Sequence, residues 1–212
     1  MNISSWPKYD QEQIEAASKV LSSGKVNNWT GNETRLFEKE FSEWCGTKYA
    51  IAVSNGSVAL TLAYESIGLK YGDEIITTPR TFVATASCAL LLGAKPVFAD
   101  VCEESGLINV DTIKPLINSK PKAISVVHLA GWPANMEDIV NLAKENGLFV
   151  IEDCSQAHGA FIKNGSSIKS VGSFGDIATW SFCQDKIIST GGEGGMITTS
   201  SEKLMEIIWS KK

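Results

Sequence analysis

Short apolar segments alternate with helix-like segments of about ten residues from Tyr49 onward, and no other feature of the sequence restricts the fold as strongly. Near-continuous apolar strands separated by helices indicate βαβ units, in which helices cover both faces of a parallel sheet. The sequence therefore predicts an α/β fold, a three-layer αβα sandwich with a mainly parallel sheet. The expected strands are Tyr49–Val53, Glu74–Thr77, Pro96–Ala99, Ala123–Val127, Leu148–Glu152, Ile177–Trp180 and Gly195–Thr199.

The remaining segments are expected to be helical or irregular. Helical spacing is found at Gln11–Leu21, Glu33–Trp44, Ser57–Ile67, Thr81–Leu92, Asp111–Ile117, Met136–Glu145 and Glu202–Trp209. The Gly- and Ser-rich stretch Cys154–Ser173 is expected to lack regular structure. Because no stretch resembles a linker, residues 1–212 are expected to form one domain, with helices at about 1–47 and a sheet with its helices at about 48–212.

Charge and cysteine usage exclude several classes of partner. The 19 Lys and Arg against 24 Asp and Glu give a net charge of −5, whereas binding to nucleic acid phosphates needs an excess of cations. No signal peptide is evident, and no apolar run approaches the roughly 18 residues of a membrane span. Five scattered cysteines indicate buried thiols in a reducing compartment. We expect a cytoplasmic protein without a nucleic-acid or membrane partner.

Ligands of open α/β sheets bind where strands end and helices begin, and Ser54–Ser57 is such a place. Gly56 lets the backbone approach a ligand, and Ser57 with the free N–H groups of the helix start suits phosphate. An ordinary helix N-cap remains an alternative interpretation. A nucleotide-binding loop is not indicated, because the glycine cluster Gly191–Gly195 precedes a strand rather than a helix.

Two further strand ends carry reactive side chains. Glu152 and Asp153 end the most apolar strand, where a carboxylate is costly to bury without a partner, and Gln156 follows in the next loop. Lys186 follows the strand Ile177–Trp180 and precedes two isoleucines. Apolar neighbours favour the neutral, nucleophilic amine, although a surface lysine is the alternative. A phosphate cup, a buried carboxylate and an amine are together what pyridoxal phosphate requires. No metal site is expected.

The ordered motifs resemble those of the DegT/DnrJ/EryC1/StrS sugar aminotransferases, pyridoxal-phosphate enzymes of the aspartate-aminotransferase fold (fold type I). The resemblance runs through nearly the whole chain. It is carried by Gly31–Phe41, Ser54–Leu60, Thr81–Thr85, Gly93–Asp100, His128–Gly131, Ile151–Gly159, Gly172–Asp176, Ser181–Lys186 and Gly192–Gly195.

The resemblance implies roles for individual residues. Lys186 would form a Schiff base with the cofactor and later move a proton, and Asp153 would keep the pyridine nitrogen protonated. Phe82 occupies the position of the aromatic ring that stacks on the cofactor, although a core role is the alternative.

The same resemblance places the other cofactor contacts. The backbone of Gly56 and Ser57, together with the hydroxyls of Ser57 and Ser181, would bind the phosphate. Gln156 would meet the 3-oxygen of the cofactor or the substrate.

The implied reaction transfers an amino group from L-glutamate, which leaves as 2-oxoglutarate, to a nucleotide-linked keto-sugar in amino-sugar and polysaccharide biosynthesis. Relatives that dehydrate sugars have histidine in place of the lysine, so Lys186 favours transamination. A sugar dehydratase, a cysteine desulfurase and a non-catalytic cofactor- or partner-binding domain remain alternatives. A homodimer is expected, since fold-type-I sites form between two subunits.

The chain departs from the family pattern in two respects. Isoleucine follows Lys186 where many members have asparagine, and Cys183-Gln-Asp replaces an upstream segment with His or Tyr. Members of the family are also nearly twice as long. Residues 1–212 are therefore expected to be the cofactor-binding large domain without the small domain, and the final helix, cut at Trp209, favours a fragment over a natural truncation.

Overall fold

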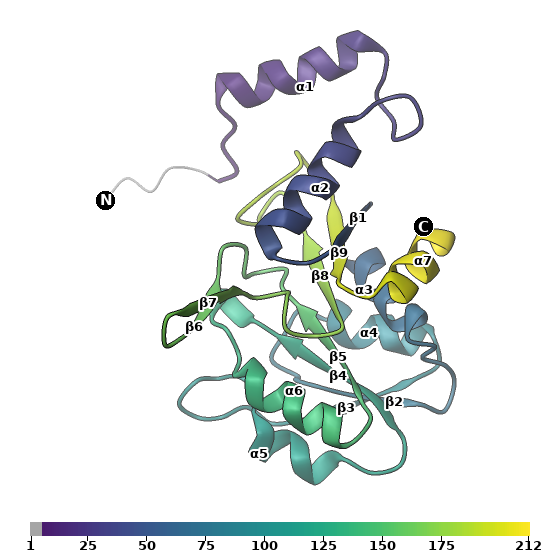
Figure 1. The fold of residues 1–212 in the computed structure, drawn as a ribbon, viewed down its shortest axis with the longest axis vertical. Coiled ribbons are helices and arrows are strands. Elements are labelled where there is room, and N and C mark those ends of the chain that lie inside the picture. The colour runs from purple at the N-terminus through teal and green to yellow at the C-terminus, as the bar shows by residue number, and fades with distance from the viewer. Residues whose placement is uncertain (1–5) are drawn as a thin grey trace.

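A seven-stranded mixed sheet forms the centre of the computed structural model, which describes residues 6–212 (Figure 1). The strand order is β1-β9-β8-β5-β4-β2-β3. Neighbours from β8 to β3 pair in parallel, whereas β9 runs antiparallel to β1 and β8, so the expected mainly parallel sheet is confirmed. The strands are β1 (Tyr49–Val53), β2 (Glu74–Thr77), β3 (Lys95–Phe98), β4 (Pro121–Val127), β5 (Phe149–Asp153), β8 (Ile177–Ser181) and β9 (Gly195–Thr199).

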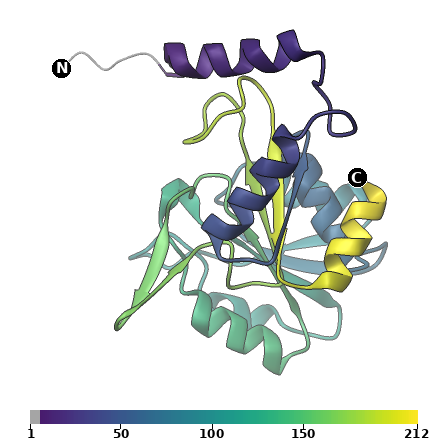
Figure 2. The same ribbon diagram turned by 45° about the horizontal axis from the view of Figure 1, so that its top comes forward.

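Helices cover both faces of this sheet and complete the three layers (Figures 1 and 2). One face carries α3 (Gly56–Ser66), α4 (Ala84–Leu91) and α7 (Glu202–Lys211). The other carries α2 (Glu33–Cys45), α5 (Val110–Ile113) and α6 (Met136–Glu145), with short 3-10 turns at Lys114–Leu116 and Leu129–Gly131. The first helix, α1 (Gln11–Ser23), buries none of its residues and lies across the top of the molecule in Figure 2.

Successive residues of β5 point to opposite faces of the sheet, and this alternation positions the chemistry. Ile151 packs in the apolar cluster beneath α3 and α4, whereas Val150 packs in the cluster beneath α6. Asp153 therefore shares the α3 and α4 side with Ile151, and Glu152 points to the opposite side. Two neighbouring carboxylates at one strand end thus enter different environments.

Two expectations about local structure are wrong. The stretch Cys154–Ser173 holds a hairpin of β6 (Phe161–Asn164) and β7 (Ser167–Ser170), whose short exposed strands lack the apolar run that identifies a strand by sequence. Helix α4 begins at Ala84 rather than Thr81, so Phe82 precedes the helix. Thr81 and Thr85 instead join their side chains across this helix start, 2.9 Å apart.

All five cysteines are free, but the expectation of buried thiols holds for only three of them. Cys45, Cys88 and Cys154 are buried, whereas Cys102 and Cys183 are partly exposed. None of the helices among residues 6–212 has both the length and the apolar character to cross a membrane.

Candidate active site

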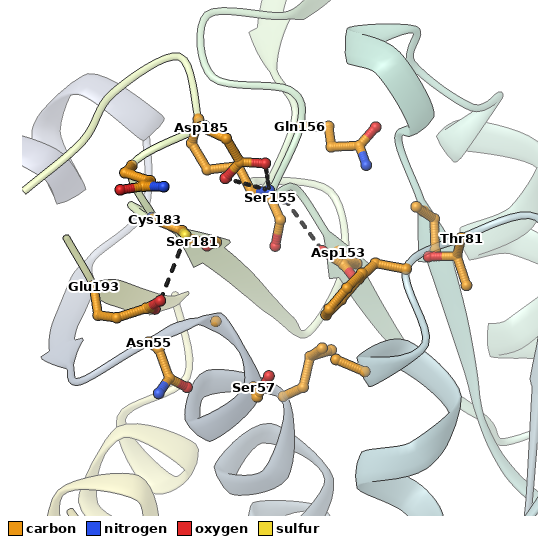
Figure 3. A pocket seen from close by; sticks show the side chains of 17 residues that line it. Asn55, Ser57, Thr81, Asp153, Ser155, Gln156, Ser181, Cys183, Asp185 and Glu193 are labelled. Carbon is orange, nitrogen blue, oxygen red and sulfur yellow. Dashed lines mark hydrogen bonds and ion pairs between the residues drawn. The ribbon is translucent and has the colours of Figure 1, made fainter. Parts of the chain in front are cut away.

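A cavity of about 570 Å³ opens where β5 and β8 end and α3 begins (Figure 3). This is the edge of an open α/β sheet at which ligands gather. The structure brings together every residue that the sequence singled out as a cofactor contact. Its lining includes Gly56, Ser57, Phe82, Asp153, Gln156, Ser181 and Lys186.

The start of α3 forms one wall of the cavity. The first N–H groups of a helix have no partner within the helix. Asn55 accepts the N–H of Val58 with its side chain at 2.8 Å and that of Ala59 with its carbonyl at 3.0 Å. The N–H groups of Gly56 and Ser57 are left for a ligand at the positive end of the helix dipole, which attracts an anion such as phosphate.

Gly56 is needed where it stands because α3 and β8 approach each other closely. A Cβ atom added at Gly56 would lie only 2.8 Å from the Cβ atom of Ser181. Ser181 Oγ accepts the N–H of Cys183 at 3.4 Å, so the hydroxyl proton of Ser181 remains able to donate. The close approach therefore places one serine donor beside the helix start.

Asp153 is a buried carboxylate, with 5% of its surface exposed. Its oxygens accept the hydroxyl of Thr85 at 2.8 Å and the N–H of Ser155 at 3.2 Å, while Thr81 donates to Thr85 in turn. Within residues 6–212, no Lys, Arg or His side chain forms an ion pair with this carboxylate. A buried carboxylate that pairs with no cation can instead pair with a protonated nitrogen of a ligand.

Lys186 also lines the cavity, and its Nζ is 3.1 Å from both carboxylate oxygens of Asp185. The hydrogen bond from Lys186 lowers the pKa of Asp185. The expectation that Ile187 and Ile188 desolvate the amine is wrong, because these side chains are 55% and 39% exposed. The amine of Lys186 is therefore next to the charged carboxylate of Asp185 and is not enclosed by apolar side chains.

Gln156 and Phe82 complete the lining. The side-chain carbonyl of Gln156 accepts the N–H of Ala130 at 2.8 Å, which leaves its NH₂ group to donate toward a ligand oxygen. Phe82 is largely exposed at the cavity wall and takes no part in the described core, so the core interpretation of this aromatic is wrong.

Sequence reasoning missed three contributors to this site. Thr85 and Thr81 orient Asp153, and Asp185 pairs with Lys186. Thr81 precedes α4 and Asp185 lies in the loop after β8, so no helical or strand spacing identifies these two residues.

Glu152 and Cys154 do not line the cavity and are buried in the protein interior. Glu152 is fully buried on the opposite face of the sheet, where His128 donates to it at 3.0 Å. His128, Glu152 and Cys154 lie close enough to hold a metal ion, but the Glu152 oxygens are already occupied by backbone donors. Burial raises the pKa of Cys154 well above its usual value, which makes a catalytic thiol at this position unsuitable.

His158 is buried behind the cavity and packs against the rings of Trp180 and Phe182. Neither ring nitrogen has a hydrogen-bond partner among the described residues. Burial, and next the charge of Lys186, lower the pKa of His158 to about 4, so this imidazole is neutral near pH 7.

Solved structures with the same architecture include two aminotransferase-related proteins. The aminotransferase from Psychrobacter cryohalolentis matches with a TM-score of 0.94 and 51% identity, over 98% of this chain and 51% of that one. NtdA from Bacillus subtilis, solved with the bound cofactor PMP, matches with a TM-score of 0.85 and 30% identity, over 94% of this chain and 44% of that one. The fold is therefore that of these proteins.

Curated relatives agree with the structural comparison. GDP-perosamine synthase of Escherichia coli O157:H7 is 42% identical over 200 residues, which cover 94% of this chain and 53% of that protein. The dTDP-3-amino-3,6-dideoxy-alpha-D-galactopyranose transaminase of Aneurinibacillus thermoaerophilus is 42% identical over 203 residues, with coverages of 94% and 53%. The chain thus spans about half the length of these relatives. A sequence model of one family matches residues 7–210, and the chain belongs to that family, the DegT/DnrJ/EryC1/StrS aminotransferases.

Proposed function

We propose that this chain is the pyridoxal-phosphate-binding large domain of an aminotransferase that transfers an amino group from L-glutamate to a nucleotide-linked keto-sugar. The observation that carries the proposal is the convergence of Lys186, Asp153 and the start of α3 on one cavity. These groups provide an amine, a buried carboxylate and an anion site, which are the contacts that pyridoxal phosphate needs. The names of the relatives supply the substrate class, since they act on GDP- and dTDP-linked sugars.

The residues present fit the cofactor. The close approach of Gly56 to Ser181 leaves no space for another side chain there, while two N–H groups at the helix start remain free for the phosphate. In the same cavity, the buried carboxylate of Asp153 meets no cation within the described chain and suits a pyridinium nitrogen. The donors and the acceptor therefore match the two charged ends of the cofactor.

Each side chain would contribute a simple physical task. The N–H groups of Gly56 and Ser57 bind and orient the phosphate, and Asp153, held by Thr85, keeps a proton on the ring nitrogen. When bound, pyridoxal phosphate supplies an electron sink for the carbanion that forms at the amino carbon. The Lys186 amine would hold the cofactor covalently and, once released, would take up the proton of the amino carbon on its own nitrogen.

Phe82 and Gln156 would orient the cofactor ring. Phe82 lines the cavity and would cover one face of the ring, which would exclude water from that side. The NH₂ group of Gln156 donates to the ring oxygen, because the carbonyl oxygen of the same side chain is held by Ala130.

The amino-donor half of the reaction tests this function directly. The chain is loaded with pyridoxal phosphate, freed of excess cofactor and mixed with L-glutamate. Conversion of the bound cofactor to its amino form, with release of 2-oxoglutarate, is the expected result and is followed by absorbance. Bound cofactor that glutamate leaves unchanged would instead identify a non-catalytic binding domain.

Asp153→Asn separates cofactor binding from cofactor activation. The amide cannot hold a proton on the ring nitrogen, so transamination with glutamate is expected to fall by about 10²- to 10⁴-fold. Covalent attachment at Lys186 should persist, since the amine and the phosphate site are untouched. Single-turnover absorbance measures the first effect, and mass spectrometry after borohydride reduction measures the second. If the variant keeps the single-turnover rate of the native chain, Asp153 has no role in the reaction.

We also propose that two copies of the chain associate and that they act in the cytoplasm. Large apolar side chains are exposed at both ends of α4, and the first of them lines the cavity: Phe82, Val83, Leu90 and Leu91. A second copy packed on this face would cover them, as large exposed apolar patches are usually covered. Sedimentation equilibrium is expected to give twice the mass of the chain, and a monomer mass at micromolar concentration would contradict the dimer.

The cytoplasmic location is proposed because five free thiols suit a reducing compartment.

A further inference from the structure

A set of buried hydroxyl groups lies behind Asp153 and begins at Tyr64 of α3. The Tyr64 hydroxyl is 2.7 Å from the backbone carbonyl of Thr85 and 2.9 Å from Oγ of Ser125 on β4. The Thr85 hydroxyl in turn donates to Oδ2 of Asp153 at 2.8 Å. Tyr64, Thr85 and Ser125 are fully buried, so water does not compete for these hydrogen bonds. The carboxylate in the cavity is thus connected through Thr85 to α3 and β4.

The direction of each hydrogen bond at Tyr64 follows from the donors available. A carbonyl oxygen only accepts, so the single hydroxyl proton of Tyr64 is donated to Thr85, and Ser125 donates to the Tyr64 oxygen. Burial, and after it the charge of Asp153, raise the pKa of Tyr64, which keeps the phenol protonated. The Tyr64 hydroxyl is therefore a permanent donor to the start of α4.

The apolar surroundings of Tyr64 do not by themselves require a hydroxyl group. Its ring packs in the apolar cluster beneath α3 and α4, together with Leu60, Cys88 and Ala89. A hydroxyl in such a cluster loses its hydration and has to recover that free energy through protein hydrogen bonds, whereas phenylalanine fills almost the same space without this cost. What tyrosine adds here is its hydrogen bonds to Thr85 and Ser125.

Thr85 is the residue through which Tyr64 reaches the active site. Tyr64 holds the carbonyl of Thr85, and the side chain of Thr85 holds Asp153. The other donor to Asp153 is the N–H of Ser155, which is 3.2 Å from the second carboxylate oxygen and gives the longer hydrogen bond. Hydrogen bonds weaken steeply as their geometry degrades, so a displaced Thr85 would leave the carboxylate free to rotate.

We propose that Tyr64 is a positioning residue of the active site, whose hydroxyl holds Thr85 where the Thr85 side chain orients the Asp153 carboxylate. Tyr64 does not line the cavity and acts through Thr85. The proposal rests on the proposed function for the group that Asp153 meets, the ring nitrogen of pyridoxal phosphate. A carboxylate held in place raises the pKa of that nitrogen by its charge, and a carboxylate that rotates away raises it less.

Tyr64→Phe tests the proposal because it removes one oxygen atom and keeps the ring in the core. The chains are loaded with pyridoxal phosphate that carries an isotopic label at the ring nitrogen, which is titrated by NMR. The nitrogen is expected to lose its proton about one pH unit lower in the variant, and the single-turnover rate with glutamate to fall about tenfold. Attachment at Lys186, measured after borohydride reduction, should persist. A ring nitrogen that titrates as in the native chain would overturn the proposal.

The matched control is Ser66→Ala, which removes another buried hydroxyl of the same helix. Ser66 donates to the carbonyl of Ala63 at 2.8 Å, within α3, and has no hydrogen bond to α4 or β5. Its loss should lower stability without moving the titration of the ring nitrogen. An equal shift in the Ser66 variant would mean that any weakening of α3 has this effect, and Tyr64 would have no special role.

A double-mutant cycle with Thr85→Val tests the route through Thr85. Once valine has removed the Thr85 hydroxyl, Tyr64→Phe should shift the titration little further, whereas Thr85→Ser keeps the hydroxyl and should titrate close to the native chain. Shifts that add fully in the double variant would contradict a route through Thr85.

Crystal structures without cofactor separate this inference from the proposed function. In Tyr64→Phe, Oγ1 of Thr85 and Oδ2 of Asp153 are expected to move beyond hydrogen-bonding distance. An unchanged Asp153 in that structure would overturn the positioning role, whatever the chain does with the cofactor. Absence of an adduct at Lys186 in the native chain would instead refute the proposed function, and the distance between Thr85 and Asp153 would still decide the role of Tyr64.

Discussion

Replacing Lys186 with alanine is expected to abolish the covalent attachment of pyridoxal phosphate and to lower transamination by at least about 10³-fold. The amine of Lys186 is the nucleophile that the cavity offers, and the buried Asp153 lines the same cavity. Borohydride reduction followed by peptide mass mapping measures the attachment. In the native chain the adduct should be found on the peptide that contains Lys186.

The matched control for this substitution is Lys203→Ala. Lys203 is exposed on α7 and takes part in none of the described ion pairs, so its loss should change neither the adduct nor the reaction. The Lys186 variant should also remain folded, because its amine pairs only with the exposed Asp185. An adduct that persists in the Lys186 variant would show that another amine reacts.

The layers could be predicted from local sequence patterns, and the residues that line the cavity from strand ends together with the family resemblance. Strand ends on one edge of a parallel sheet lie side by side, so motifs far apart in sequence, such as Gly56 and Ser181, had to meet. The structure adds how closely they meet, which depends on the packing of α3 against β8. Packing at that scale is not encoded in the spacing of the motifs.

The environment of each side chain was harder to predict. Apolar neighbours in sequence suggested an enclosed Lys186, but the loop turns Ile187 and Ile188 outward and brings Asp185 to the amine. The β6–β7 hairpin was missed for a related reason, since its exposed strands bury too little apolar surface to leave a pattern. Loops are specified by contacts across the fold, and a sequence pattern reports only local ones.

The end of β5 shows how one pair of residues serves two purposes. Alternation along the strand sends Asp153 to the cavity and Glu152 to the opposite face. The residue pattern alone shows two adjacent acidic residues, and only the family resemblance singled out Asp153. The hydrogen bonds distinguish the two residues. Asp153 can still accept hydrogen bonds from a ligand, whereas the oxygens of Glu152 are occupied by donors of the protein.

Glu152 organises the loop that follows the hairpin. Its carboxylate accepts the backbone N–H groups of Gly172, Phe174 and Gly175 at 2.8, 2.8 and 2.7 Å. His128 Nδ1 accepts the N–H of Ala134 at 3.2 Å, so the ring proton is on Nε2 and donates to Glu152 at 3.0 Å. Four donors therefore converge on one fully buried side chain.

Glu152→Ala is expected to lower the free energy of unfolding by about 4 kcal/mol at pH 7, because it leaves several buried donors without an acceptor. Burial raises the pKa of Glu152, but the hydrogen bond from His128 and the backbone donors outweigh it and lower the pKa overall. The unfolded value is about 4.3, so this stabilisation is present above that pH and disappears as the pH falls through the lower folded pKa.

Urea unfolding of the native chain and of the Glu152→Ala variant measures this effect. The difference between them should be full at pH 7 and should shrink below about pH 4 as Glu152 takes up a proton. His158 titrates in both proteins, so its effect cancels in the difference. Asp153→Asn is the matched control, and it should cost less stability because it removes one oxygen acceptor from two donors, whereas Glu152→Ala removes the acceptor of four. Equal losses in the two variants would contradict the assignment of stability to Glu152 and chemistry to Asp153.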